Sequence, residues 1–116
     1  MDITPYNDFC KKREAYGWII FELPEKVLKC SDETPFYKQI LELVKTTRKL
    51  ALDMQKVVFV DSSIITLVLS VEKMLTEKGG ALVVLYPNKQ AAELFSVTSI
   101  DKITKILANE NDLQHL

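Results

Sequence analysis

The amino-acid sequence predicts an α/β fold in which helices pack against a mixed β-sheet of four to five strands. Runs of β-branched and aromatic residues alternate along the chain with segments whose apolar residues recur every three or four positions. That alternation favours parallel strand pairs, with about four α-helices covering the sheet. The chain has 116 residues, 47% of them apolar, which is enough for one core and too little for two. Residues 1–116 are therefore predicted to be a single domain.

Up to three strands are expected before the first helix. Residues 18–23 form a run of β-branched and aromatic side chains that Pro24 ends. Residues 26–30 could add a second, short strand. Residues 6–16 are polar with scattered aromatic side chains, and they allow only an edge strand.

The first helix is predicted from its start signals. Thr34 is a favoured N-cap, Pro35 fits the first helical position, and the helix should end near Arg48. Residues 49–54 then read as a strand. Residues 57–60 are a continuous apolar run, which is typical of an element buried on both sides.

The segment 64–78 is rich in strand-forming residues at its start, yet its polar residues predict a helix. They recur at intervals of four, three and four, as on one side of a helix: Thr66, Ser70, Lys73 and Glu77. The intervening apolar residues then form a buried face: Ile64, Leu67, Val68, Val71, Met74 and Leu75. The pair Gly79-Gly80 provides the C-terminal stop.

The last third of the chain predicts three more elements and a tail. Residues 81–86 form a strand, and Asn88 can cap a short helix over 89–96. Residues 102–107 alternate polar and apolar side chains, as a half-exposed edge strand does. Residues 110–116 form a final helical turn or a tail.

Composition excludes several classes of function. Fifteen basic and sixteen acidic residues give a formal net charge of −1, so the chain lacks the basic face that nucleic acid requires. No apolar run approaches the roughly 20 residues that span a bilayer, and no signal peptide is visible, so we expect a cytoplasmic protein without a membrane partner. Cys10 and Cys30 are expected to be free thiols and match no zinc spacing, and His115 is expected to be solvated. No metal site, cofactor or catalytic pair is predicted, so the chain is not expected to be an enzyme.

The stretch Asp61-Ser62-Ser63 is the richest junction between a strand and a helix. In open α/β sheets function concentrates where strand ends meet helix N-termini. A phosphate on Ser62 would meet unpaired backbone N–H groups at the helix start and would add about −1.5 to −2 charges beside Asp61. The residue types alone favour a simpler interpretation, in which the three residues are no more than a helix cap, because Asp and Ser are the favoured capping residues. Asp53 likewise could be a solvated carboxylate at the end of a strand.

Three stretches of the sequence resemble the STAS family, which is named after sulphate transporters and anti-sigma factor antagonists. They are residues 57–63, with Asp-Ser-Ser after an apolar run, residues 78–88, with a Gly-Gly turn before a strand, and residues 92–103. The similarity extends over residues 49–113 and is only topological before that. It implies a STAS-like mixed sheet.

The resemblance also implies a function. Ser62 would be the residue that a partner anti-sigma factor serine kinase phosphorylates, and the unphosphorylated form would bind that kinase and free a sigma factor. Around Ser62 we expect a partner-binding surface made of Asp53, Asp61, Ser63, Ile64, Thr66, Ser70 and Lys73. The family usually has glycine where Ile64 and Thr66 stand, which motivates an alternative: a STAS docking subunit of a transport or signalling complex that works without phosphorylation.

Overall fold

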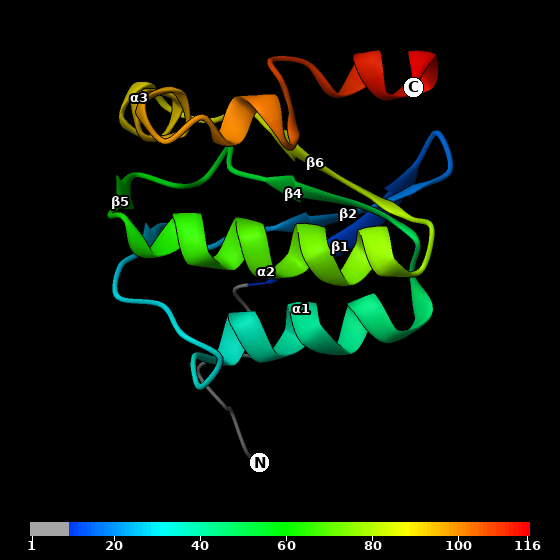
Figure 1. Cartoon of the computed structure of the whole chain (residues 1–116), viewed down its shortest axis with the longest axis horizontal. Helices are drawn as coiled ribbons and strands as arrows, with labels where there is room; N and C mark the ends of the chain where they lie inside the picture. Colours follow the sequence, from blue (N-terminus) through cyan, green and yellow to red (C-terminus); the bar gives the residue numbers. More distant parts are fainter. Residues whose placement is uncertain (1–9) are drawn as a thin grey trace.

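The computed structural model describes residues 10–116, which form a mixed five-stranded sheet flanked by helices (Figure 1). The strand order is β1-β2-β4-β6-β7; β1 and β2 are antiparallel, and the other neighbouring pairs are parallel. The strands are β1 (Lys12–Ala15), β2 (Trp18–Glu22), β4 (Lys49–Asp53), β6 (Ala81–Leu85) and β7 (Lys105–Leu107). The predicted α/β class is confirmed, and β1 is the edge strand expected within 6–16, of which residues 6–9 lie outside the described range.

Two long helices cover one face of the sheet. They are α1 (Pro35–Thr46), which ends two residues before the predicted Arg48, and α2 (Ser63–Glu77). Figure 1 shows both beneath the sheet and the 3₁₀ helix η2 (Glu110–His115) above it. At one end of the sheet lie α3 (Lys89–Val97) and the 3₁₀ helix η1 (Ile100–Lys102), whose buried Phe95 and Ile100 belong to the same core as α1 and α2. The edge strand expected over 102–107 is shorter than predicted, because η1 occupies its first residue.

Side chains of the central strands point alternately to the two faces of the sheet, and they form an apolar core on each face. In β4, Leu50 and Leu52 belong to the large core under α1 and α2, whereas Ala51 points to the opposite face. The same division holds in β6, where Val84 faces the helices and Val83 faces away. Successive strand residues point to opposite faces, so strands covered on both sides are apolar throughout.

The helix prediction for 64–78 is confirmed, together with its stop. The Gly80 N–H donates to the carbonyl of Leu75, and Gly79 has φ +76°, so the helix ends in the left-handed turn that glycine favours. The strand-forming residues at the start of the segment did not prevent helix formation, because their side chains fill the core on one helical face. The predicted cap of α3 is also confirmed: Asn88 Oδ1 accepts from the Ala91 N–H at 2.8 Å.

The prediction for residues 57–60 is wrong in part. Only β5 (Phe59–Val60) is extended, and it pairs with β3 (Lys26–Val27) in a separate two-stranded parallel sheet. Val58 and Phe59 are 53% and 50% exposed, so the run is not buried on both sides. The small sheet has only one covered side, and an apolar run alone does not reveal how many sides of a strand are covered.

Candidate functional site

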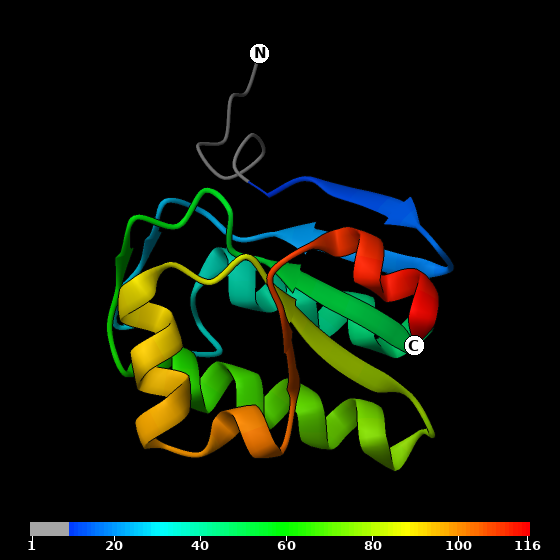
Figure 2. The same ribbon diagram turned by 90° about the horizontal axis from the view of Figure 1, so that it is seen from above.

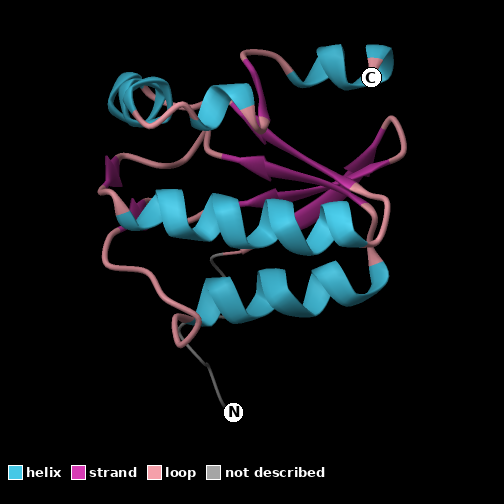
Figure 3. Cartoon of the chain, viewed as in Figure 1, coloured by secondary structure: helices cyan, strands magenta, loops and turns pink. Residues whose placement is uncertain are grey.

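Ser62 occupies the position between β5 and α2, in the short loop visible in Figure 3. It is the N-cap residue of α2, yet its side chain makes no capping hydrogen bond. The residue is exposed, and its hydroxyl contacts no polar partner among residues 10–116. The Ser62 hydroxyl is therefore open to an approaching molecule.

Asp61 performs the capping that the three-residue stretch predicted. Its Oδ1 accepts from the Ser63 N–H at 3.0 Å and from the Ser63 hydroxyl at 2.6 Å, and its Oδ2 accepts from the Lys29 N–H at 2.9 Å. The hydrogen bond from the Ser63 hydroxyl is the main reason why the pKa of Asp61 lies below its ordinary value. The carboxylate is therefore ionised at neutral pH.

Ser63 is fully engaged, in contrast to Ser62. Besides donating to Asp61, its hydroxyl accepts from the Cys30 N–H at 2.9 Å. The Asp61 N–H in turn donates to the Val27 carbonyl at 3.2 Å, so the segment after β3 is bonded to the start of α2 at several points. Lys29 within that segment has φ +49°, a left-handed conformation that is uncommon for a lysine. Two adjacent serines thus have different environments.

The expectation that unpaired N–H groups surround Ser62 is wrong for the three residues that follow it. The Ser63 N–H bonds to the Asp61 carboxylate, the Ile64 N–H to the Asp61 carbonyl at 3.2 Å, and the Ile65 N–H to the Ser62 carbonyl at 3.0 Å. The first donors of the helix are therefore already satisfied. A negative group on Ser62 would lie at the surface beside the Asp61 charge, and these three N–H groups would not be free to neutralise it.

The predicted partner-binding residues divide into surface and core. Thr66 and Lys73 are exposed and Ser70 is half-buried, all on α2. Thr66 and Ser70 line a shallow groove of about 440 Å³ between α2 and the segment that leads into α1. Asp61 and Ser63 are half-buried at the start of α2, so the surface part of the prediction runs from there along the helix.

Asp53 and Ile64 do not belong to that surface. Asp53 is 2% exposed, and its Oδ2 accepts from Arg13 Nη2 at 3.0 Å, because a buried carboxylate requires a partner. Ile64 is fully buried among the core residues of α2. Neither side chain can contact a partner that docks on the surface, so their predicted partner-binding role needs correction.

A second groove beside Ser62 was not predicted. It measures about 400 Å³ and lies between the start of α2 and one stripe of α3: Gln90, Glu93, Leu94 and Val97, opposite Val60, Asp61 and Ser62. Val97 is 79% exposed, which is unusual for an apolar residue, and Val58 and Phe59 are also exposed. In the sequence, the α3 residues of this groove follow Gln90 at intervals of three, four and seven, which places them on one face of a helix. The sequence does not show that this face lies opposite Ser62.

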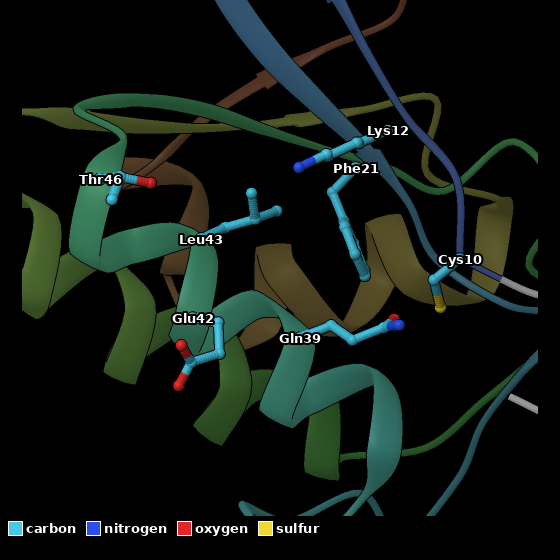
Figure 4. A pocket seen from close by; sticks show the side chains of 7 residues that line it. All are labelled: Cys10, Lys12, Phe21, Gln39, Glu42, Leu43 and Thr46. Atoms are coloured by element: carbon cyan, nitrogen blue, oxygen red, sulfur yellow. The ribbon is translucent and has the colours of Figure 1, made fainter. Parts of the chain in front are cut away.

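A further cavity, of about 370 Å³, is separate from this site (Figure 4). It lies between the first two strands and α1, and Figure 4 shows Gln39 reaching toward Cys10. Burial raises the pKa of the Cys10 thiol to about 11, so the thiol is protonated at neutral pH. The predicted site residues are not part of its lining, which is Cys10, Lys12, Phe21, Gln39, Glu42, Leu43 and Thr46.

The family model of the STAS domain matches residues 11–113, nearly the whole chain. The chain belongs to the STAS domain family. Among curated protein sequences, none matches it. None of the helices in the described part of this STAS domain is long and apolar enough to cross a membrane.

Solved structures share the fold at low sequence identity. A provisionally assigned anti-sigma factor antagonist from Thermotoga maritima is 22% identical, with a TM-score of 0.79 over 91% of this chain and 92% of its own. An anti-sigma factor antagonist from Mycobacterium paratuberculosis is 14% identical, with a TM-score of 0.79 over 97% and 95%. The phosphorylated form of the Bacillus cell-fate determinant SpoIIAA is 16% identical, with a TM-score of 0.67 over 89% and 94%.

Proposed function

We propose that this STAS domain is an anti-sigma factor antagonist, a protein-binding switch that phosphorylation of Ser62 controls. The unphosphorylated form binds an anti-sigma factor serine kinase in the cytoplasm and thereby frees a sigma factor; the chain itself catalyses no reaction. The observation that carries the proposal is the difference between the two serines. Ser62 has a free, exposed hydroxyl, whereas the Ser63 hydroxyl is held by Asp61 and Cys30.

The docking surface follows from the side chains around that hydroxyl. It comprises Asp61 and Ser63 at the start of α2 and Thr66, Ser70 and Lys73 along it. On the other side of Ser62, Leu94 and Val97 offer apolar contact area. A kinase that reaches Ser62 has to cover these neighbours, and their burial would contribute to the affinity.

Phosphorylation would weaken such a contact for electrostatic reasons. A phosphate adds about −1.5 to −2 charges, and Asp61 beside it is already ionised. The first N–H groups of α2 have acceptors, so the added charge would remain at the surface and would have to be desolvated when the partner docks. The apolar side chains near Ser62 make that desolvation more costly. Release of the kinase is the expected consequence.

The test compares two substitutions in a binding titration with a purified candidate partner, a GHKL-type serine kinase from the same organism. Ser62→Ala should bind like the wild type, whereas Ser62→Asp should lose about 100-fold in affinity, or roughly 3 kcal/mol. Ser96→Asp is the matched control, because Ser96 is an exposed serine on α3 outside the groove. Equal affinities for Ser62→Asp and Ser62→Ala would contradict the switch.

The docking-subunit alternative predicts a different pattern in the same titration. Substitutions of Ser62 would then leave binding intact, while Ser70→Glu or Lys73→Glu would disrupt it through a charge on the α2 surface. Thr66, where the family usually has glycine, supports this alternative, because an exposed β-branched side chain restricts close approach of another backbone.

A further inference from the structure

The sheet has a second apolar face that only a small element covers. On the side away from α1 and α2, five side chains are each at most 3% exposed: Trp18, Ile20, Ala51, Val83 and Leu85. One further buried residue completes this core, Leu113 of η2, which is 1% exposed. Figure 2 shows η2 lying over β2 and β4. Within residues 10–116, Leu113 is thus the one buried residue that this core receives from outside the strands, while Ala15, Tyr86 and Leu107 pack against it partly buried.

The helix η2 depends on its tertiary contacts. It is a 3₁₀ helix of six residues, and such helices are rarely longer than three or four because their hydrogen bonds have poor geometry. Besides Leu113, three polar links hold it to the sheet. Arg13 pairs with Glu110, the Glu110 N–H donates to the Tyr86 hydroxyl at 3.2 Å, and the Tyr16 hydroxyl donates to Asn111 at 3.0 Å.

Release of η2 would not leave an isolated charge in the sheet. The guanidinium of Arg13 also bonds Glu22 at 2.8 Å and Asp53 at 3.0 Å, and both bonds lie within the sheet. If Glu110 moves away into water, the buried Asp53 carboxylate keeps its cationic partner. Opening a buried ion network is costly when it leaves a buried charge without a partner, and release of η2 avoids that cost.

We infer that η2 is a latch that opens in a local step, without unfolding of the domain, and uncovers the apolar sheet face around Trp18. Elements with few buried contacts open at free energies well below that of global unfolding. The large core under α1 and α2 shares no residue with the smaller one, so it can remain packed while η2 is released. The uncovered face would be a concealed apolar surface of this domain.

Trp18 is the single tryptophan of the chain and lies under the latch, so its fluorescence reports on opening. In the full chain, Leu113→Ala should shift the Trp18 emission to longer wavelength and raise its acrylamide quenching constant severalfold. The far-UV circular dichroism spectrum, to which the helices α1 and α2 contribute, should remain that of the wild type. Leu116→Ala is the matched control, because Leu116 follows the same helix but is 47% exposed, and it should change nothing.

Native-state hydrogen exchange in the wild type keeps the inference testable if Leu113→Ala unfolds the whole domain. The Glu110 amide, which donates to Tyr86, and the Leu116 amide, which donates to Leu113, should exchange through an opening whose urea dependence is clearly above zero but well below that of global unfolding. The Leu52 amide, in the centre of the sheet, should exchange only by global unfolding. Equal exchange free energies and equal urea dependence for these amides would overturn the latch, as would unchanged Trp18 quenching in a folded Leu113→Ala variant.

Discussion

Replacing Ser63 by alanine should destabilise the domain far more than replacing its neighbour Ser62. Loss of the Ser63 hydroxyl leaves the Cys30 N–H without its acceptor, and Cys30 is only 8% exposed. A buried donor without a partner costs about 1–3 kcal/mol. The hydroxyl also donates to Asp61, but water can replace that bond because the carboxylate is close to the surface. We therefore expect a loss of about 2 kcal/mol in the free energy of unfolding for Ser63→Ala.

The matched variant Ser62→Ala should stay within about 0.5 kcal/mol of the wild type, as exposed substitutions without lost contacts do. Urea unfolding followed by circular dichroism measures both, and the slope m should be the same in each. In a domain of this size, 2 kcal/mol corresponds to a decrease of about 8 °C in Tm. If the two variants lose equal stability, or Ser62→Ala loses more, the distinction between a held and a free serine is incorrect.

Two further predictions concern the capping carboxylate and the turn after α2. The pKa of Asp61 should lie below the ordinary value of about 3.9, so its stabilisation is present above that pH and is lost as the pH falls through the lower, folded-state pKa. An NMR titration should show this pKa rising in Ser63→Ala, and an unchanged value would contradict the hydrogen bond as its cause. Gly80→Ala would place a Cβ 2.2 Å from the Arg48 carbonyl oxygen and should cost about 3 kcal/mol in a urea titration. Gly79→Ala, with open space but φ +76°, should cost only about 1 kcal/mol, and a larger loss there than at Gly80 would refute the close approach.

Residue periodicity predicted the helices and their alternation with strands along the chain, because each element depends on which faces of a local segment are buried. The start of α2 is an example: its strand-forming residues competed with a polar stripe at helical spacing, and the stripe was decisive. For residues 57–60 the prediction from the apolar pattern was wrong in part. Whether Val58 faces a neighbour depends on β3 and its surroundings, which are distant in sequence.

The sequence predicted which segment forms the candidate site, but it did not predict the hydrogen bonds of the individual side chains. The identical side chains of Ser62 and Ser63 differ because only Ser63 bonds Asp61 and the Cys30 N–H. The Cys30 contact lies 33 positions earlier in the chain, and no local pattern carries that information. Asp53 was expected in solvent or at a partner surface because its partner Arg13 is forty residues away.

Ile64 was assigned both to the buried face by helical spacing and to the partner surface by resemblance. Its complete burial bears out the helical spacing.

The position of phosphate on this domain tests the proposed switch most directly. The unphosphorylated full chain is incubated with ATP and a GHKL-type serine kinase that binds it, and the modified residue is mapped by mass spectrometry. The free hydroxyl of Ser62 and the engaged hydroxyl of Ser63 predict phosphate on Ser62 alone, and none on the Ser62→Ala variant. Phosphate on Ser63, or no phosphate on either serine, would contradict the account.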